Sequence, residues 1–236
     1  MTPLLAHRQA RLAGAAYLVI IALGLFAQLV RDGLTVVGDP AATARRILEH
    51  ESLFRAGFAA GVVVVILNAF VVVLLFELFR TIDATLAALM AFFGVVATAI
   101  EGANLVNNLA PVVLLDDGPR FADEAYHALR IQALGYGISL AVFGFFCLVA
   151  GFLIVRSGFL PRALGALLAL GGGCYLVNSF ALFLAPGLAS RLFPLVLLPC
   201  FLAEASLAVW LVTVGVKPPR PQSAGRPGSP NLVGSG

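Results

Sequence analysis

The sequence predicts an all-α, polytopic membrane protein with six transmembrane helices in one bundle. Hydrophobic residues make up 61% of the chain and charged residues only 11%, whereas a soluble domain carries roughly 25% charged residues. Lipid offers no partners for backbone groups, so only helices and closed barrels can span a membrane. Six apolar runs are each about as long as the ~20 residues that a spanning helix needs, and they are too long for barrel strands. They cover residues 12–30, 57–79, 86–115, 131–155, 160–184 and 195–216.

The first loop is the longest between two predicted spans, and it contains the sequence GDPAATARRILEHESLFR from residue 38. Asp39 is a good N-cap, and Pro40 suits the first turn of a helix. Ile47, Leu48 and Phe54 form a partial apolar stripe. We therefore expect a short amphipathic helix in this loop, lying at the membrane surface. An ordinary solvated loop helix is the alternative interpretation.

The other connections are short, and the chain ends in a segment of different composition. The third loop begins with the sequence DDGP at residue 116, a strong turn signal, and we expect it to continue into the fourth span as one helix. After residue 216 proline, glycine and serine dominate, and such a composition cannot form a core. We therefore expect a six-helix transmembrane domain over residues 1–216 and a disordered tail over residues 217–236.

The distribution of lysine and arginine near the span ends predicts the orientation. With the N-terminus inside, the inner segments hold slightly more basic residues than the outer loops, and the inner loops are short and nearly free of acids. We therefore expect both termini in the cytoplasm. The net charge is +3 without any basic cluster longer than two arginines, which argues against nucleic acid as a partner. Membrane lipid is the expected partner, because anionic headgroups suit a mild basic excess.

Five sequence blocks carry a resemblance to a known family. They read ARLAGAAYLVI from residue 10, GDPAATARRILEHESLFR from residue 38, RSGFLPRALGALLAL from residue 156, GCYLVNSFALFLAP from residue 173 and LAEASLAVWLVTVGV from residue 202. Together they resemble the bacterial membrane family catalogued as domain-of-unknown-function family 4386, over residues 10–216. The resemblance implies a six-helix bundle in a bacterial cytoplasmic (inner) membrane. It implies no activity and therefore supplies no catalytic residues.

Polar side chains inside the spans are the best indication of a functional site in this sequence. A charged residue at the centre of a transmembrane helix costs about 2.5–3.5 kcal/mol on insertion scales, so such residues tend to face the bundle interior. The third span holds the densest set. Thr98, Glu101, Asn104 and Asn108 fall within one third of the helix circumference, with Asn107 beside them. We expect this polar stripe in the middle and outer half of the span.

Other spans add single polar residues that would meet the stripe in one outer-side pocket if the bundle is compact. Gln28 lies near the outer end of the first span and Asn68 at the centre of the second. Asn178 lies in the outer half of the fifth span and Glu204 near the middle of the sixth. The ligand-binding candidates are therefore Thr98, Glu101, Asn104, Asn108, Gln28, Asn68, Asn178 and Glu204.

Glu101 and Glu204 are the candidates for a catalytic role. Apart from Arg162 at the start of the fifth run, no lysine or arginine lies within a predicted span, so each carboxyl must hold its proton or reach an arginine of an outer loop. Arg55 and Arg130 flank the second and fourth spans and are the expected charge partners. A carboxylic acid kept neutral in apolar surroundings can serve as a general acid. That chemistry would suit a lipid-like substrate, such as a prenyl chain that cyclises or isomerises on protonation.

Three functions remain open. We expect a non-enzymatic membrane protein whose outer-side polar pocket binds a small amphiphile or lipid. The alternatives are a membrane-embedded enzyme that uses a buried Glu as general acid or base, and a small transporter or partner subunit of a membrane complex. Interhelical hydrogen bonds alone also explain the polar stripe. No metal-ligand spacing, phosphate loop or nucleophile motif is present in the sequence, so no metal or cofactor is expected.

Overall fold

A computed structural model describes residues 3–192 and 195–216. Over these residues it is all-helical, and six of its helices are long and apolar enough to cross a membrane. The predicted fold class is therefore confirmed, whereas the expected tail, 217–236, lies outside the described residues. The elements are α1 (Pro3–Leu34), α2 (Pro40–Glu49), α3 (Glu51–Phe79), α4 (Ala84–Asp116), η1 (Pro119–Phe121), α5 (Ala122–Ser157), α6 (Arg162–Leu184), α7 (Pro186–Leu192), η2 (Leu195–Leu197) and α8 (Leu198–Thr213).

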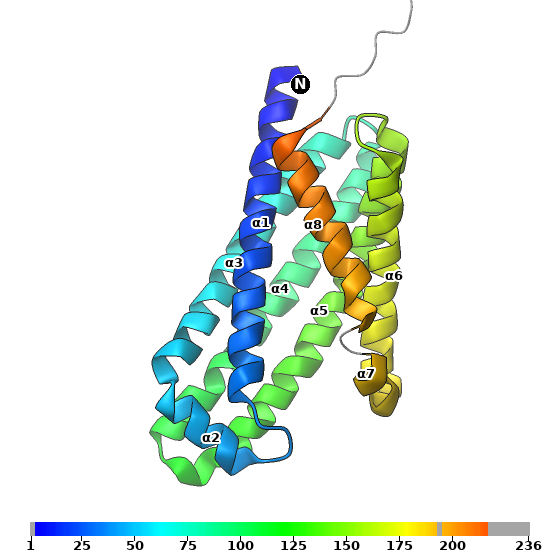
Figure 1. The fold of residues 1–236 in the computed structure, drawn as a ribbon. Helices are drawn as coiled ribbons and strands as arrows, with labels where there is room; N and C mark the ends of the chain where they lie inside the picture. Colours follow the sequence, from blue (N-terminus) through cyan, green and yellow to red (C-terminus); the bar gives the residue numbers. More distant parts are fainter. Residues whose placement is uncertain (1–2, 193–194, 217–236) are drawn as a thin grey trace, which may run out of the picture.

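The long helices run alternately up and down the bundle and close into a ring (Figure 1). Packing follows chain order from α1 to α3, α4, α5 and α6, and α8 closes the ring because it packs against both α6 and α1. The start of α1 and the end of α8 lie at one end of the bundle, named here the terminal end. Helices α2 and α7 lie at the opposite end, named the α2 end.

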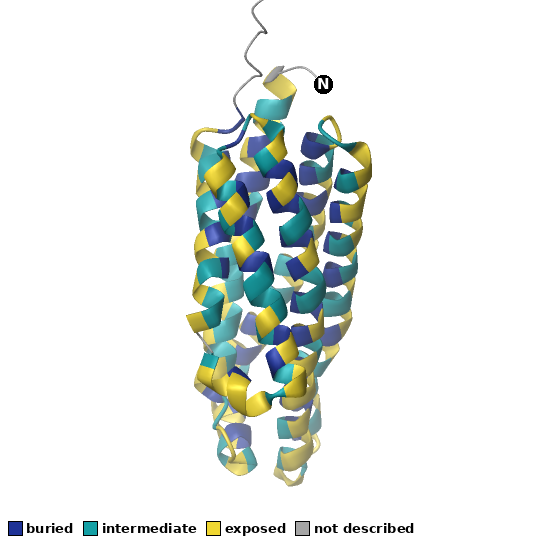
Figure 2. Cartoon of the chain, turned by 90° about the vertical axis from the view of Figure 1, so that its right-hand side faces the viewer, coloured by how far each residue is buried: buried dark blue, intermediate teal, exposed yellow. Residues whose placement is uncertain are grey.

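Large apolar side chains are exposed along the outer surface of the bundle. Val106 is 72% exposed and Phe92 62%, although both lie within the spanning helix α4. Figure 2 shows that exposed residues follow the helices over the length of the bundle instead of gathering at its ends. Soluble monomers rarely expose contiguous apolar patches larger than a few hundred Å². This surface is therefore suited to contact with the hydrocarbon layer of a membrane.

Glycines allow the helices of the ring to approach closely. A Cβ atom added at Gly172 of α6 would lie 2.7 Å from the carbonyl oxygen of Gly144 of α5. A Cβ atom added at Gly14 of α1 would lie 2.7 Å from the Cβ of Leu211 and 2.8 Å from the carbonyl oxygen of Ala208, both in α8. Small residues are typical of such contacts, because van der Waals packing of backbones drives helix association in lipid.

The expected surface helix is present as α2, and it is docked on the bundle. The Asp39 side chain caps it and accepts a hydrogen bond from the Ala42 amide at 2.8 Å. Ile47 is fully buried in an apolar cluster that includes Val112 of α4. Leu48, expected on the same apolar stripe, is exposed, because adjacent residues of a helix point about 100° apart.

The first four spanning helices extend beyond the apolar runs that predicted them, whereas α6 and α8 are shorter than their runs. Helix α1 continues to Leu34 instead of ending at residue 30, because backbone hydrogen bonding does not stop where the side chains become polar. Helix α5 begins at Ala122 and includes the end of the third loop, as expected. Helix α7 in the fifth loop was not predicted; Pro186, its first residue, suits the first turn of a helix.

Candidate functional site

A cleft of about 660 Å³ enters the ring between α1 on one side and α5, α6, α7 and α8 on the other. Helices α1 and α8 touch at Gly14 near the terminal end and separate toward the α2 end (Figure 1). The cleft follows α1 from Ile20 to Asp32, which is about 18 Å at the rise of an α-helix. Its walls are mostly apolar and include Leu25 and Phe201. We name this space the central cleft.

One end of the central cleft, the Glu204 end, holds a carboxyl group and a tyrosine hydroxyl. The Tyr175 hydroxyl of α6 donates a hydrogen bond to a carboxyl oxygen of Glu204 in α8. Tyr17 of α1 is buried beside the same carboxyl but does not line the cleft. The polar groups that this end offers to a ligand are therefore the Glu204 carboxyl and the Tyr175 hydroxyl.

The other end of the central cleft, the Arg31 end, lies toward the α2 end of the bundle. The Arg31 guanidinium donates to the side-chain oxygen of Gln132 in α5 at 2.7 Å, and to Gln28 one turn earlier in α1. Gln28 donates to both carboxylate oxygens of Asp32, at 3.0 and 2.9 Å. The guanidinium carbon also lies 5.9 Å from the centre of the Tyr136 ring. Amide groups and an aromatic face thus hold Arg31 in place.

The polar stripe of α4 lies beside the central cleft and is linked to it through Gln132. Asn104 is buried and donates to the backbone oxygen of Gln132 at 2.9 Å and to Glu101 at 3.5 Å. Asn107 donates to Asn104 at 3.2 Å. Gln132 therefore accepts from Arg31 with its side chain and from Asn104 with its backbone. Because the Gln132 side chain is only 1% exposed, this link between α1, α5 and α4 lies inside the bundle.

The eight ligand-binding candidates fall into two groups. Gln28, Asn178 and Glu204 line the central cleft. Asn68 donates to Thr98 at 3.0 Å, which joins α3 to α4. The residues outside the cleft lining are Thr98, Glu101, Asn104, Asn108 and Asn68. The structure therefore does not bring all candidates into one cavity, and interhelical hydrogen bonds involve Thr98 and Asn104 of the α4 stripe.

The expected pairing of Arg55 with a buried carboxyl is wrong, and Arg130 forms no ion pair among the described residues. Arg55 pairs with Glu51, one turn away in α3, at 2.6 Å, and reaches Asp116 at 3.8 Å. Arg130 is exposed. An acid on the same helix face as Arg55 satisfies it more readily than a residue on a distant helix, because side chains four residues apart are neighbours.

Sequence reasoning missed the residues that organise the two ends of the central cleft. Arg31 is the cation within electrostatic range of Glu101, but it directly follows the first apolar run, and the apolar pattern therefore places it in a loop. One signal could have found it: Gln28, Arg31 and Asp32 have the i, i+3, i+4 spacing of side chains that meet on one helix face. Tyr175 carried a second signal, since a tyrosine hydroxyl within a span needs a polar partner.

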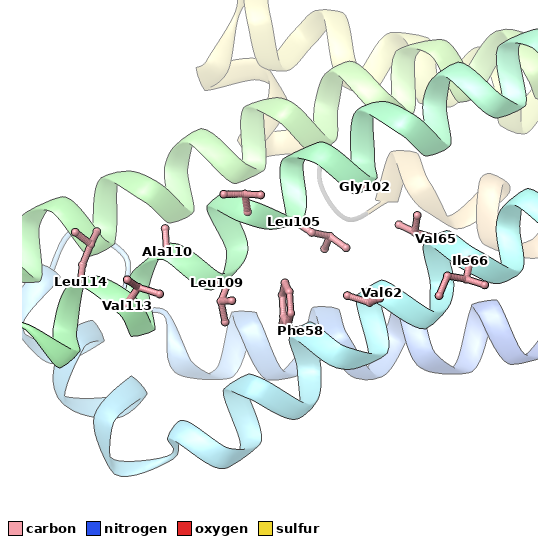
Figure 3. Close-up of a pocket in the computed structure, with 11 residues that line it drawn as sticks. Phe58, Val62, Val65, Ile66, Gly102, Leu105, Leu109, Ala110, Val113 and Leu114 are labelled. Atoms are coloured by element: carbon pink, nitrogen blue, oxygen red, sulfur yellow. The ribbon is translucent and has the colours of Figure 1, made fainter.

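A second hollow lies on the outer face of the bundle between α3 and α4 (Figure 3). Its volume is about 530 Å³, and apolar residues and one glycine line it. Phe58 and Val62 of α3 face Leu109 and Val113 of α4 across it (Figure 3). Such a surface can contact hydrocarbon but offers no polar group for recognition or chemistry. The central cleft is therefore the candidate functional site.

Comparison with known proteins identifies a family and no activity. The family model described as "Domain of unknown function (DUF4386)" matches residues 12–215. A protein of Archaeoglobus fulgidus, called "Uncharacterized protein", is 27% identical over 154 residues, which are 65% of this chain and 80% of that protein. No solved structure matches the chain.

Proposed function

We propose that this chain, which belongs to the DUF4386 family, binds a small amphiphile or lipid in its central cleft. The observation that carries the proposal is the pattern of the cleft, whose apolar walls separate two polar ends. Arg31 and Gln28 form one end, and Glu204 and Tyr175 form the other. Small-molecule sites are typically clefts of roughly 300–1,000 Å³ with apolar walls and a few placed polar groups. The volume of about 660 Å³ lies within that range.

The surroundings of the cleft support entry of the ligand from the membrane. Leu25 of α1 and Phe201 of α8 line the cleft and are 45% and 42% exposed. An apolar molecule dissolved in the leaflet can therefore reach the cleft without crossing a polar surface. We further propose that the protein lies in a bacterial cytoplasmic membrane with both termini inside, from the distribution of lysine and arginine. The α2 end and the Arg31 end would then face the outer leaflet.

Two glycines offer a matched test of the cleft. Gly24 lines the central cleft and Gly173 of α6 does not, and a Cβ atom added at either would meet nothing within 4 Å. Gly24→Phe should fill the cleft and abolish binding of hexadecanoate and hexadecanol by the purified protein in detergent micelles. Gly173→Phe should bind both as the unsubstituted protein does. Native mass spectrometry measures the occupancy, and equal occupancy in the two variants would refute the cleft as the site.

A membrane-embedded enzyme is the second candidate function, favoured by the Glu204 end. A carboxyl group beside an apolar cleft, held by Tyr175, suits general acid–base chemistry on a hydrocarbon. Glu204 would give its proton to one carbon of a prenyl double bond. The carboxylate would then remove a proton from the carbon next to the resulting cation, and the net reaction is an isomerisation. Glu101 is the weaker catalytic candidate, because it lies outside the cleft lining.

Glu204→Gln separates the two candidate functions. The substitution keeps the shape of the side chain and removes the transferable proton. If the protein is an enzyme, conversion of a prenyl alcohol by the natural chain should be lost in Glu204→Gln while hexadecanol still binds. Gas chromatography of the extracted lipid measures the conversion. If product still forms with the variant, or if none forms with the natural chain, the proposal that the protein is an enzyme acting through Glu204 is rejected.

A further inference from the structure

We propose that the Arg31 end of the central cleft is an anion site that selects single-chain amphiphiles with a carboxylate or phosphate head. The inference rests on the proposed function and names the headgroup that the cleft takes. Three observations support it: the guanidinium has no anion in contact, it is held in a fixed position, and the apolar wall begins beside it.

The first observation concerns the charge of Arg31. A guanidinium has five N–H donors, and its hydrogen bonds here go to the neutral amide oxygens of Gln132 and Gln28. None of the ion pairs among residues 3–192 and 195–216 includes Arg31. The neighbouring carboxylate, Asp32, accepts two hydrogen bonds from Gln28 instead. Glu101 lies within electrostatic range of Arg31 but forms no ion pair with it. Arg31 therefore lines the cleft with a charge that no described anion contacts directly.

The second observation is that the guanidinium is held before any ligand arrives. Gln132 fixes it from α5, Gln28 fixes it from its own helix, and the Tyr136 ring lies against it. Gln132 is in turn anchored by Asn104, which donates to its backbone oxygen. A planar guanidinium matches carboxylate and phosphate oxygens in geometry. Because the side chain is already ordered, binding an anion costs it little further entropy.

The third observation distinguishes a lipid anion from a free one. Gly24 and Leu25 line the cleft one to two turns from Arg31, and Leu182 and Phe201 continue the apolar wall. A chain attached to the anion would lie along this wall toward the Glu204 end. Asp32 also lines the cleft and opposes any anion through its charge. Contacts of a chain with this wall oppose that repulsion, whereas inorganic phosphate has no chain that could make them.

The test compares hexadecanoate, hexadecanol and inorganic phosphate on the purified full chain in detergent micelles at neutral pH, by native mass spectrometry. The natural chain should bind hexadecanoate at least about tenfold more tightly than hexadecanol, because a hydrogen bond to a charged group adds to chain burial. Arg31→Gln should remove this preference and leave hexadecanol binding unchanged.

The control Arg191→Gln removes an exposed arginine of α7, beside the cleft but outside its lining, and should keep the preference. Arg31→Lys keeps the charge and should retain most of the preference for hexadecanoate over hexadecanol. This variant keeps the proposal testable if Arg31→Gln does not fold.

Each outcome bears on one of the two proposals. Equal affinity of the natural chain for the two chain probes, or a preference that survives in Arg31→Gln, would overturn the anion site and leave the cleft as a binding site. Phosphate binding as tight as that of hexadecanoate would overturn the choice of a lipid anion. Chain probes that bind Gly24→Phe as well as the natural chain would refute the proposed function itself.

Discussion

Amide side chains join neighbouring helices inside this bundle. Asn68 connects α3 to α4 through Thr98, and Asn104 connects α4 to α5 through the backbone of Gln132. Such bonds add only about 0.6 kcal/mol each on average, because helices that are separated in the membrane also find polar partners. Thr98 and Asn104 of the α4 stripe therefore act as helix contacts, while Arg31, which forms no ion pair among the described residues, lies at one end of the central cleft.

The Asn68–Thr98 bond can be measured with a double-mutant cycle. Replacing both residues with Ala, singly and together, should give a coupling of about 0.6 kcal/mol in the free energy of unfolding. Unfolding is followed by helical circular dichroism as dodecyl sulfate is added to mixed micelles. The pair Asn68 and Asn108 is the control; the two lie on different helices without a mutual hydrogen bond, so their effects should add. A coupling near zero for Asn68 and Thr98 would mean that the bond does not stabilise the bundle.

Helix α1 determines where the ring is closed and where it is open. Near the terminal end, Gly14 brings the backbones of α1 and α8 together. Ten residues later, Gly24 faces the central cleft, where nothing lies within 4 Å of an added Cβ atom. Glycine therefore allows close helix packing at position 14 and borders open space at position 24. The difference depends on how near the neighbouring helix lies.

The contrast between these two glycines yields a prediction for α1. Gly14→Ala should lower the free energy of unfolding by about 1–3 kcal/mol, because the methyl group would overlap α8. Gly24→Ala should raise it by about 0.5–1 kcal/mol, because alanine favours a helix interior more than glycine does. Dodecyl sulfate titration of the two variants measures both changes. Equal shifts would contradict the close contact between α1 and α8.

Over the whole molecule, the described ends of the chain lie on the same side of the bundle (Figure 1). Six crossings within the described residues account for this, since an even number returns the chain to its starting side. The α2 end therefore lies on one side of the membrane and the terminal end on the other. Which end is cytoplasmic depends on the bias of lysine and arginine toward the inner side.

Reporter fusions test the orientation. A fluorescent protein that folds only in the cytoplasm, fused after residue 216, should fluoresce, and alkaline phosphatase at the same point should be inactive. As the matched control, phosphatase inserted at Ala185, between α6 and α7, should be active. Phosphatase activity at residue 216 together with inactivity at Ala185 would reverse the proposed orientation and place the Arg31 end in the cytoplasmic leaflet.

Prediction from the sequence succeeded where hydrophobic length or a local cap decides the structure. The six spans, the Asp39 cap and the family resemblance are confirmed. It was less accurate at polar boundaries, where α1 continues past its apolar run and carries Arg31 into the bundle. Choosing Arg55 as a charge partner failed because Glu51, on the same helix, already pairs with it.

The sequence by itself determined that this chain is a six-span helical membrane protein, because the length and hydrophobicity of a segment are enough to decide whether it crosses a bilayer. Only the tertiary structure decided which polar groups meet. Arg31 and Gln132 are 101 residues apart, and Tyr175 and Glu204 are 29 apart; no spacing along the chain relates such pairs. The central cleft likewise depends on α1 and α8 touching at one end and separating at the other, which is set by side-chain packing between helices distant in sequence.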